Sequence, residues 1–402
     1  MAGTAILMTT AMVSAQTSLW PQTSWPMATP ESQGMSAERL REALEYAAGP
    51  NNLRSHCASI HRNGFVVAEG YWKPGQTDPN ATTMLYSISK AFATTLVGAA
   101  ERDGLLDTED EAHNYDIPQW RGTTAERITV DMLLRHDSGR YYGSDLEDIG
   151  IPQFAPLDGS PPSTDPSSQT EYAIGIPMEY NPGQVTEYNQ MAFQTLERVL
   201  RNATDTRVQD YVGQKIFEPL GFEYDAFLEE RGVLTNIPNG PLLYAGVTCA
   251  CRDLARFGTL WMTDGTWGDG VNMTATEVFT PEFWRKSMSR PRGGRAYHWN
   301  QNGDNFQADG MGGQFVAFNA ELGLVITREG HVLDEWIESF SPSEFVNLVM
   351  SAFTSEEDKK KASRWNFAFA KKDEEAGEES LGNPAAERRF WEWMRSQKEK
   401  GE

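Results

Sequence analysis

The feature that most constrains this chain is a serine and a lysine three residues apart at the start of an apolar segment. Ser87 and Lys90 precede residues 91–100, whose side chains are apolar or small except for two threonines. A helix with so little polar surface has to be buried, and residues three apart share one face of a helix. The pattern therefore predicts a buried helix on which the Ser87 hydroxyl meets the Lys90 amine.

This pairing suits nucleophilic catalysis. A serine hydroxyl is a weak nucleophile until a neighbouring base removes its proton, and a desolvated lysine can be that base. Backbone N–H groups at a helix N-terminus also stabilise negative charge on an attacked carbonyl. Because a chain of this length contains about one Ser-x-x-Lys by chance, the hypothesis of a catalytic serine needs support from other segments.

The composition indicates a folded globular protein and excludes some partners. Of the 402 residues 39% are hydrophobic, and twelve are tryptophan. This is enough apolar material for a large core. The formal net charge of −22 repels nucleic acids and anionic membranes. No apolar stretch approaches the ~18 residues of a membrane helix, so we expect no membrane span.

The three cysteines are Cys57, Cys249 and Cys251. Their odd number argues against a disulfide scaffold. Cys249 and Cys251 lack a nearby pair of cysteines or histidines that would complete a metal site. The sequence therefore predicts three small buried thiols, no metal site and no cofactor.

Both ends of the chain differ from its middle. Residues 5–13 are modestly apolar, and Val13-Ser14-Ala15 resembles a signal-peptidase site, but Arg39 is the first basic residue. A shortened signal peptide, which implies a periplasmic or secreted protein, and a disordered start of a cytoplasmic protein both fit this pattern. A proline-rich lead-in follows up to residue 27, and residues 354–402 form a highly charged extension.

Between these ends, strand patterns flank a helical middle. The Asn63-Gly64 pair between two β-type runs predicts a hairpin over residues 57–68, and further strands are expected late in the chain. The late strands are expected at 297–299, 306–308, 314–318 and 324–327, and helices at 37–44, 189–202, 207–216, 251–262 and 342–353. This order predicts one sheet that takes strands from both ends of the chain and is interrupted by a helical insertion.

Three further segments follow the Ser87 helix in a telling order. They are residues 128–139 (ITVDMLLRHDSG), residues 181–190, which contain Tyr188-Asn189-Gln190, and residues 310–315 (GMGGQF). With these segments, residues 28–353 resemble the serine β-lactamase and penicillin-binding-protein superfamily. The resemblance is greatest to the branch of class C β-lactamases, D-aminopeptidase-like enzymes, esterases and 6-aminohexanoate-oligomer hydrolases.

The resemblance implies a fold and a set of roles. The fold would be α/β (α+β), an antiparallel sheet flanked by helices, with the insertion at about 105–245. Ser87 matches the acylated nucleophile, Lys90 its partner and Tyr188 a base. A phenol has a pKa near ~10 in water, so it needs a nearby cation to act as a base. The backbone N–H groups of Ser87 and Gln314 would form the oxyanion hole. The resemblance also implies substrate contacts from Gln190, Met311, Gly312 and Gly313.

Two departures from the family pattern bear on the substrate. Gln190 stands where the family usually has asparagine, and Met311 replaces a cationic or imidazole residue that helps to bind a substrate carboxylate. This loss favours a small neutral ester or amide as the substrate. A β-lactamase or D-amino-acid peptidase, and a non-catalytic binding or sensory module, stay open as alternatives. Trp299 is expected at the pocket, with core packing as its alternative, and His136 is expected to pack.

Overall fold

The computed structural model describes residues 6–7, 20–21, 24–52, 54–141, 169–228, 241–268, 275–289, 296–302, 305–330 and 340–364. Its centre is a seven-stranded sheet in which every neighbouring pair is antiparallel. The strands lie in the order β1 (Ile6–Leu7), β3 (Phe65–Tyr71), β2 (Ser55–Arg62), β12 (Leu324–Gly330), β11 (Gln314–Asn319), β10 (Asn305–Gly310) and β9 (Asn300–Asn302).

The sheet is assembled from both ends of the chain, as the sequence predicts. Asn63 and Gly64 both have positive φ angles, 50° and 80°, and this geometry closes the β2–β3 hairpin. Strand β2 then pairs with β12, with Ile60 opposite Ile326. The mixture of helices and antiparallel strands confirms the expected fold class.

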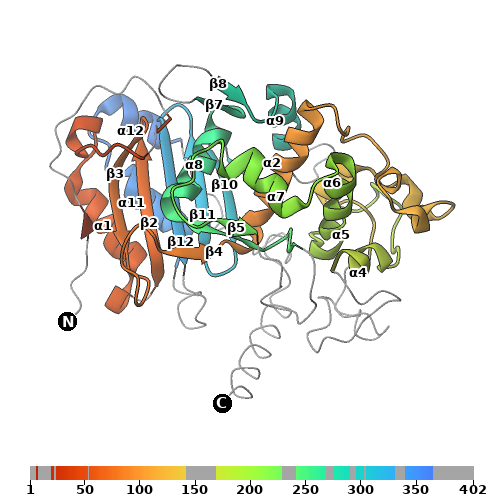
Figure 1. Ribbon diagram of the computed structural model, residues 1–402. Coiled ribbons are helices and arrows are strands. Elements are labelled where there is room, and N and C mark those ends of the chain that lie inside the picture. The colour runs from red at the N-terminus through yellow and green to blue at the C-terminus, as the bar shows by residue number, and fades with distance from the viewer. Residues whose placement is uncertain are drawn as a thin grey trace, which may run out of the picture.

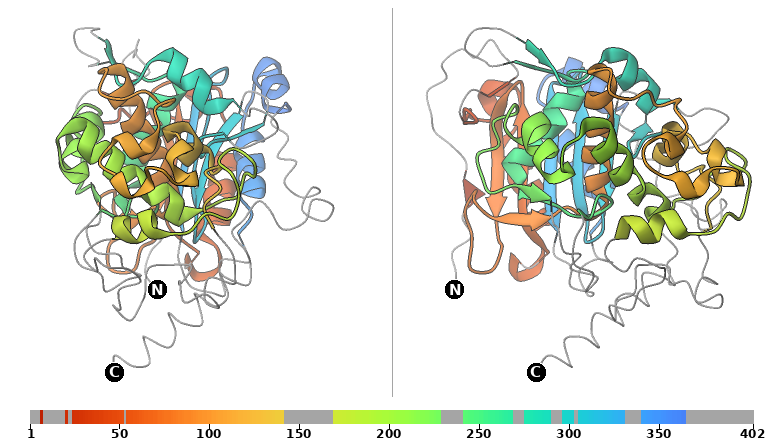
Figure 2. Two further views of the ribbon diagram at one scale, coloured as in Figure 1. Left: turned by 90° about the vertical axis from the view of Figure 1, so that its right-hand side faces the viewer. Right: turned by 45° about the vertical axis from the view of Figure 1, so that its right-hand side comes forward.

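Helices cover both faces of this sheet (Figures 1 and 2). One apolar core joins α1 and α11 to one face of the sheet. The other core joins α2, α8 and the helices between residues 105 and 245 to the opposite face. The helices are α1 (Ala37–Ala48), α2 (Ser89–Arg102), α3 (Val130–Arg135), α4 (Gln169–Gly175), α5 (Gln190–Gln194), α6 (Leu196–Thr204), α7 (Val208–Val212), α8 (Cys251–Met262), α9 (Pro281–Met288), α11 (Pro342–Met350) and α12 (Glu356–Ala362). Helix α2 is buried from Ser89 to Ala100.

Two smaller sheets complete the fold. The first has the order β4 (Thr82–Met84), β6 (Val247–Ala250) and β5 (Phe227–Leu228), and the second is the pair β7 (Thr266–Gly268) and β8 (Ala275–Glu277). Strand β6 matters for the site because its Val247 carbonyl accepts a hydrogen bond from Leu85 N–H at 2.8 Å. This bond fixes the backbone just before Ser87.

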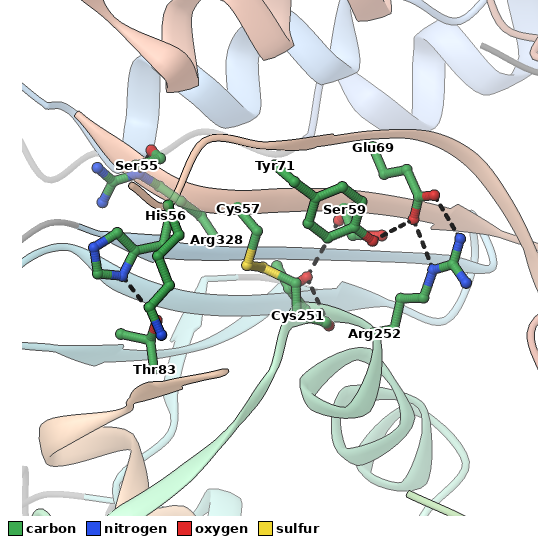
Figure 3. Close-up of a disulfide and its surroundings, with 12 residues drawn as sticks. Ser55, His56, Cys57, Ser59, Glu69, Tyr71, Thr83, Cys251, Arg252 and Arg328 are labelled. Carbon is green, nitrogen blue, oxygen red and sulfur yellow. Dashed lines mark hydrogen bonds and ion pairs between the residues drawn. A yellow bond between two sulfur atoms is a disulfide. The ribbon is translucent and has the colours of Figure 1, made fainter. Parts of the chain in front are cut away.

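The expectation of three free thiols is wrong. Cys57 of β2 and Cys251, the first residue of α8, form a disulfide, and only Cys249 among the three is free. Figure 3 shows a second buried cross-link beside it, in which Arg252 binds the Glu69 carboxylate and Tyr71 donates to the same group. The two cysteines are 194 residues apart, so their meeting depends on how α8 packs on the sheet, which their spacing does not reveal.

One late strand is also displaced from its predicted place. Residues 297–299 are not a strand, because His298 has a φ of 64°, and a left-handed residue interrupts an extended chain. The strand β9 begins immediately afterwards, at Asn300.

Several sequence predictions lie outside the described residues. They concern residues 1–5 and 8–19 of the signal-like start and residues 365–402 of the charged extension. Among the residues that the structure does describe, no helix is both long and apolar enough to cross a membrane.

Candidate active site

Ser87 lies in a single 3₁₀ turn, η3 (Tyr86–Ile88), which runs directly into α2. Tyr86, the residue before it, has a φ of 48°, a backbone conformation that residues other than glycine rarely adopt. Ser89 fixes the other side of the turn, because its hydroxyl accepts a hydrogen bond from Val247 N–H at 2.9 Å. Ser87 is therefore held on a sharply bent backbone at the N-terminus of a buried helix.

Lys90 and Tyr188 converge on the Ser87 hydroxyl. Lys90 Nζ lies 3.0 Å from Ser87 Oγ, and Tyr188 Oη lies 2.8 Å from the same oxygen. The Lys90 side chain is fully buried, and its amine also donates to the Tyr244 carbonyl at 2.9 Å. Ser87 and Lys90 thus form one hydrogen-bonded group with Tyr188, which comes from a distant segment.

The Lys90 amine is also close to the aromatic ring of Tyr188. Nζ lies 4.8 Å from the ring centroid, a distance at which a cation is attracted to a ring face. Gln190 Oε1 lies 3.5 Å from the same amine, so the glutamine that departs from the family pattern reaches Lys90 with a long contact.

The loop that carries Tyr188 is held by Asn189, which sequence reasoning did not select. Asn189 is buried and caps α5 by accepting a hydrogen bond from Ala192 N–H at 2.8 Å. Its amide nitrogen donates to the carbonyls of Arg140 and Tyr141 at 3.1 and 3.2 Å. The available signal was an asparagine directly before a helical pattern, which is typical of an N-cap.

His136 packs beneath this loop, in the kind of position expected for it. Its ring lies 4.6 Å from the Tyr188 ring and 5.4 Å from the Phe193 ring, centroid to centroid. Its Nδ1 lies 3.1 Å from Asn189 N. The histidine therefore packs against the ring of Tyr188 and supports its position.

The glycine turn, which we define as residues 310–314, runs from the last residue of β10 to the first residue of β11 and borders Ser87. A Cβ atom on Gly310 would lie 2.3 Å from the Leu85 carbonyl oxygen and 3.3 Å from Ser87 N. Only a glycine allows such a close approach between the end of β10 and the η3 turn. Met311, half-buried, follows directly.

Gln314, whose backbone N–H is the expected second oxyanion donor, lies at the far end of the glycine turn from Gly310. It is the first residue of β11 and lies opposite Gly310, so β10 is the strand that reaches the Ser87 backbone. Its buried side chain accepts a hydrogen bond from Gly330 N–H at 2.8 Å and donates to the Gly330 carbonyl at 3.2 Å. The side chain thus anchors the glycine turn to β12.

Trp299 lies in the core rather than at the pocket. Its side chain is 1% exposed, and its ring packs against Phe257, Trp261 and Phe318 at centroid distances of 5.1 to 6.3 Å. The expectation that Trp299 contacts substrate is therefore corrected, and its packing alternative describes what the structure shows.

Comparisons with known proteins agree with this geometry. A family model described as Beta-lactamase matches residues 57–328. The 6-aminohexanoate-dimer hydrolase of Paenarthrobacter ureafaciens is 22% identical over 288 residues, which cover 67% of this chain and 70% of that protein.

Solved structures share the fold. A family VIII carboxylesterase superposes with a TM-score of 0.59 at 15% identity, covering 80% of this chain and 98% of that one. A class C β-lactamase from Rhodobacter sphaeroides superposes with a TM-score of 0.57 at 16% identity, covering 79% and 100%. Because the family model spans well over half of the sequence, the chain belongs to the beta-lactamase family.

Proposed function

We propose that this protein is a serine hydrolase that cleaves small neutral esters or amides through an acyl-enzyme on Ser87. The observation that carries the proposal is the position of Ser87 Oγ within hydrogen-bond distance of both Lys90 Nζ and Tyr188 Oη. A nucleophile beside two groups that can exchange its proton is the arrangement that covalent catalysis needs. The family membership supports this chemistry.

The proposed reaction has two acyl-transfer steps. In the first, Ser87 Oγ attacks the substrate carbonyl while its proton passes to Tyr188 or Lys90. The tetrahedral intermediate then expels the alcohol or amine, which takes up that proton. In the second, water attacks the ester on Ser87, its proton returns through the same groups, and the acid leaves. The balance is one water consumed for each ester or amide bond cleaved.

The intermediate needs donors for its oxyanion. The Ser87 N–H is one candidate, because it lies at the start of a buried helix. The resemblance to the superfamily implied that the Gln314 N–H is the second donor. We propose instead that the peptide joining Gly310 to Met311 supplies it, since Gly310 lies against Ser87 N.

The preference for neutral substrates rests on the cations near the site. Met311 carries no charge. Arg135 binds the Asp131 carboxylate at 2.9 Å and donates to the carbonyls of Ser289 and Lys286, so its guanidinium is engaged within the protein. Arg292 lies outside the described residues.

The test compares three substrate classes on one preparation: p-nitrophenyl esters, short linear amides and a chromogenic cephalosporin. We expect ester or amide turnover that disappears in Ser87→Ala and falls by roughly 10²–10⁴-fold in Lys90→Ala, because a general base is lost. Circular dichroism on both variants checks that they fold. Preferred cephalosporin turnover would identify a β-lactamase. Absence of turnover together with absence of labelling by a fluorophosphonate would favour a binding module.

A further inference from the structure

Arg328 is a buried arginine that holds the backbone of the glycine turn. It lies on β12, where it is paired with Phe315 of β11 and only 1% exposed. Its Nη1 donates to the Gly312 carbonyl at 3.3 Å and also to the Gly313 carbonyl. One guanidinium therefore binds two successive carbonyls of the segment that borders Ser87.

The rest of the guanidinium is fixed to the scaffold. Nε donates to Ser55 Oγ at 2.8 Å, and Nη2 donates to the Arg54 carbonyl at 2.6 Å. The guanidinium carbon lies 3.6 Å from the centroid of the Phe340 ring. The planar fork of an arginine can make such divergent bonds at once, whereas a lysine amine cannot. Arg328 thus links the glycine turn to β2 and to the residues that precede α11.

No carboxylate forms an ion pair with Arg328 among the residues that the structure describes. Burial, and to a smaller extent the positive charge of the nearby Arg54, lowers the pKa of Arg328 to about 9. The side chain therefore stays cationic at neutral pH. Placing a charge in the interior without an opposite charge is costly. Here carbonyl oxygens accept its hydrogen bonds, and two of them belong to the glycine turn.

The glycines fit around this side chain. Gly312 and Gly313 have φ angles of 80° and 72°, and a Cβ atom on Gly313 would lie 2.2 Å from Arg328 Nη1. A Cβ atom on Gly330 would lie 1.7 Å from the Gly312 carbonyl oxygen. The turn can therefore reach the guanidinium only because these positions have no side chain.

We infer that Arg328 is a positioning residue that sets the backbone of the glycine turn beside Ser87. In a trans peptide the C=O and the following N–H point in opposite directions. Holding the carbonyls of Gly312 and Gly313 therefore also fixes the directions of the N–H groups of Gly313 and Gln314, and Gln314 is paired with Gly310 across the turn. The inference rests on the proposed function, because this backbone is where the oxyanion would form. Arg328 itself acts from beneath the turn.

The test uses Arg328→Met and Arg328→Lys, with Arg62→Met as the matched control. Arg62 is also buried on the main sheet and stacks on a phenyl ring, with its guanidinium carbon 4.4 Å from the Phe353 centroid. It pairs with Leu324, four residues before Arg328 on β12, which is roughly 13 Å along the strand. Its ion pair is with Asp358 at 3.0 Å.

Two measurements are made below the melting temperature of every variant. For p-nitrophenyl acetate we expect Arg328→Met to lower kcat by up to about 10²-fold with little change in KM, since small misplacements of catalytic groups have effects of that size. Arg328→Lys should be intermediate. In hydrogen exchange, the peptide that contains the glycine turn should exchange faster in both Arg328 variants and at the wild-type rate in Arg62→Met.

Each outcome decides the inference. Unchanged kcat and exchange in the Arg328 variants, or equal changes in Arg62→Met, would overturn it. If Arg328→Met does not fold, Arg328→Lys is judged by the same two readouts. If the wild-type protein hydrolyses neither esters nor amides, the proposed function fails, and the exchange comparison alone decides whether Arg328 holds the turn.

Discussion

Asp309 is a half-buried carboxyl one residue before Gly310. Gln307 Nε2 donates to its Oδ2 at 2.8 Å and to its Oδ1 at 3.1 Å, and Asn300 Nδ2 donates to Oδ2 at 3.3 Å. Burial outweighs these hydrogen bonds and raises the pKa of Asp309 to about 6. An exposed aspartate has a pKa near ~3.9.

This raised pKa predicts a pH dependence of stability. Below pH ~4 Asp309 is protonated in both the folded and the unfolded chain. Between pH ~4 and ~6 only the folded chain keeps the proton, so the free energy of unfolding falls as pH rises and levels off above ~6. Across this pH window the free energy of unfolding of the wild-type protein should fall by on the order of 1 kcal/mol relative to that of Asp309→Asn.

Urea unfolding of wild type and Asp309→Asn at several pH values between 4 and 7.5 measures the difference. Other titrating groups contribute equally to both proteins and cancel. The raised pKa would be contradicted if the difference in the free energy of unfolding between the two proteins stayed constant with pH. It would also be contradicted if the wild type became relatively more stable as the pH rises.

At the scale of residues, the sequence predicted those site residues that are close together along the chain or that belong to a recognisable motif. Ser87 and Lys90 meet because three residues on a helix span one turn, and Tyr188 was identified by its motif. Arg328 could not be found in this way. Its role depends on the pairing of β11 with β12 and on the fold of the glycine turn, which no short spacing encodes. Trp299 was selected but lies in the core, because the sequence does not distinguish an aromatic residue that lines a pocket from one that packs in a core.

Among the elements, the disulfide between β2 and α8 should contribute measurably to stability. It closes a loop of 194 residues, and cross-links of long loops stabilise proteins by about 2–4 kcal/mol. We expect the Cys57→Ser/Cys251→Ser double variant to unfold at lower urea concentration than the wild type. A reducing agent should destabilise the wild type and leave the double variant unchanged.

Cys249→Ser provides the control for this experiment. Cys249 is a buried thiol, and burial raises its pKa well above the usual value, so it is unreactive in the folded protein. Its variant should keep the full response to the reducing agent. If the reducing agent has the same effect on the double variant, the stabilisation does not come from the Cys57–Cys251 bond.

The elements that the sequence placed well are those with strong local signals. The Asn63-Gly64 turn and the apolar periodicity of α8 are examples. The strand expected at 297–299 failed at His298, because aromatic residues favour strands whereas the left-handed backbone of His298 is imposed by the surrounding fold. The prediction of three free thiols failed for the same reason, since cysteines 194 residues apart are brought together only by tertiary structure.

For the whole molecule, the net charge of −22 acts together with Met311. The charge repels anions at long range, and Met311 offers no cation to bind a carboxylate. We expect kcat/KM for neutral short-chain esters to exceed that for carboxylate-bearing substrates, and the gap to narrow with added salt. Met311→Lys should raise kcat/KM for the carboxylate-bearing substrates by roughly 10-fold or more, the equivalent of one charged hydrogen bond.

Kinetics with a neutral ester and a carboxylate-bearing ester of the same leaving group, at low and high ionic strength, check this expectation. The neutral ester serves as the internal control, because its kcat/KM should respond little to salt. Equal kcat/KM values for the two esters in the wild type would mean that another cation binds the carboxylate.

The pairing of β2 with β12 has a consequence for how the protein is made. During translation β2 and β3 emerge roughly ten seconds or more before β12, and until then one edge of the hairpin offers unpaired backbone groups to other chains. Ser87, Lys90 and Tyr188 all precede the glycine turn in the sequence. A nascent chain therefore carries Ser87 well before the strand that completes the candidate site, so the proposed hydrolytic activity requires that the last strands have left the ribosome.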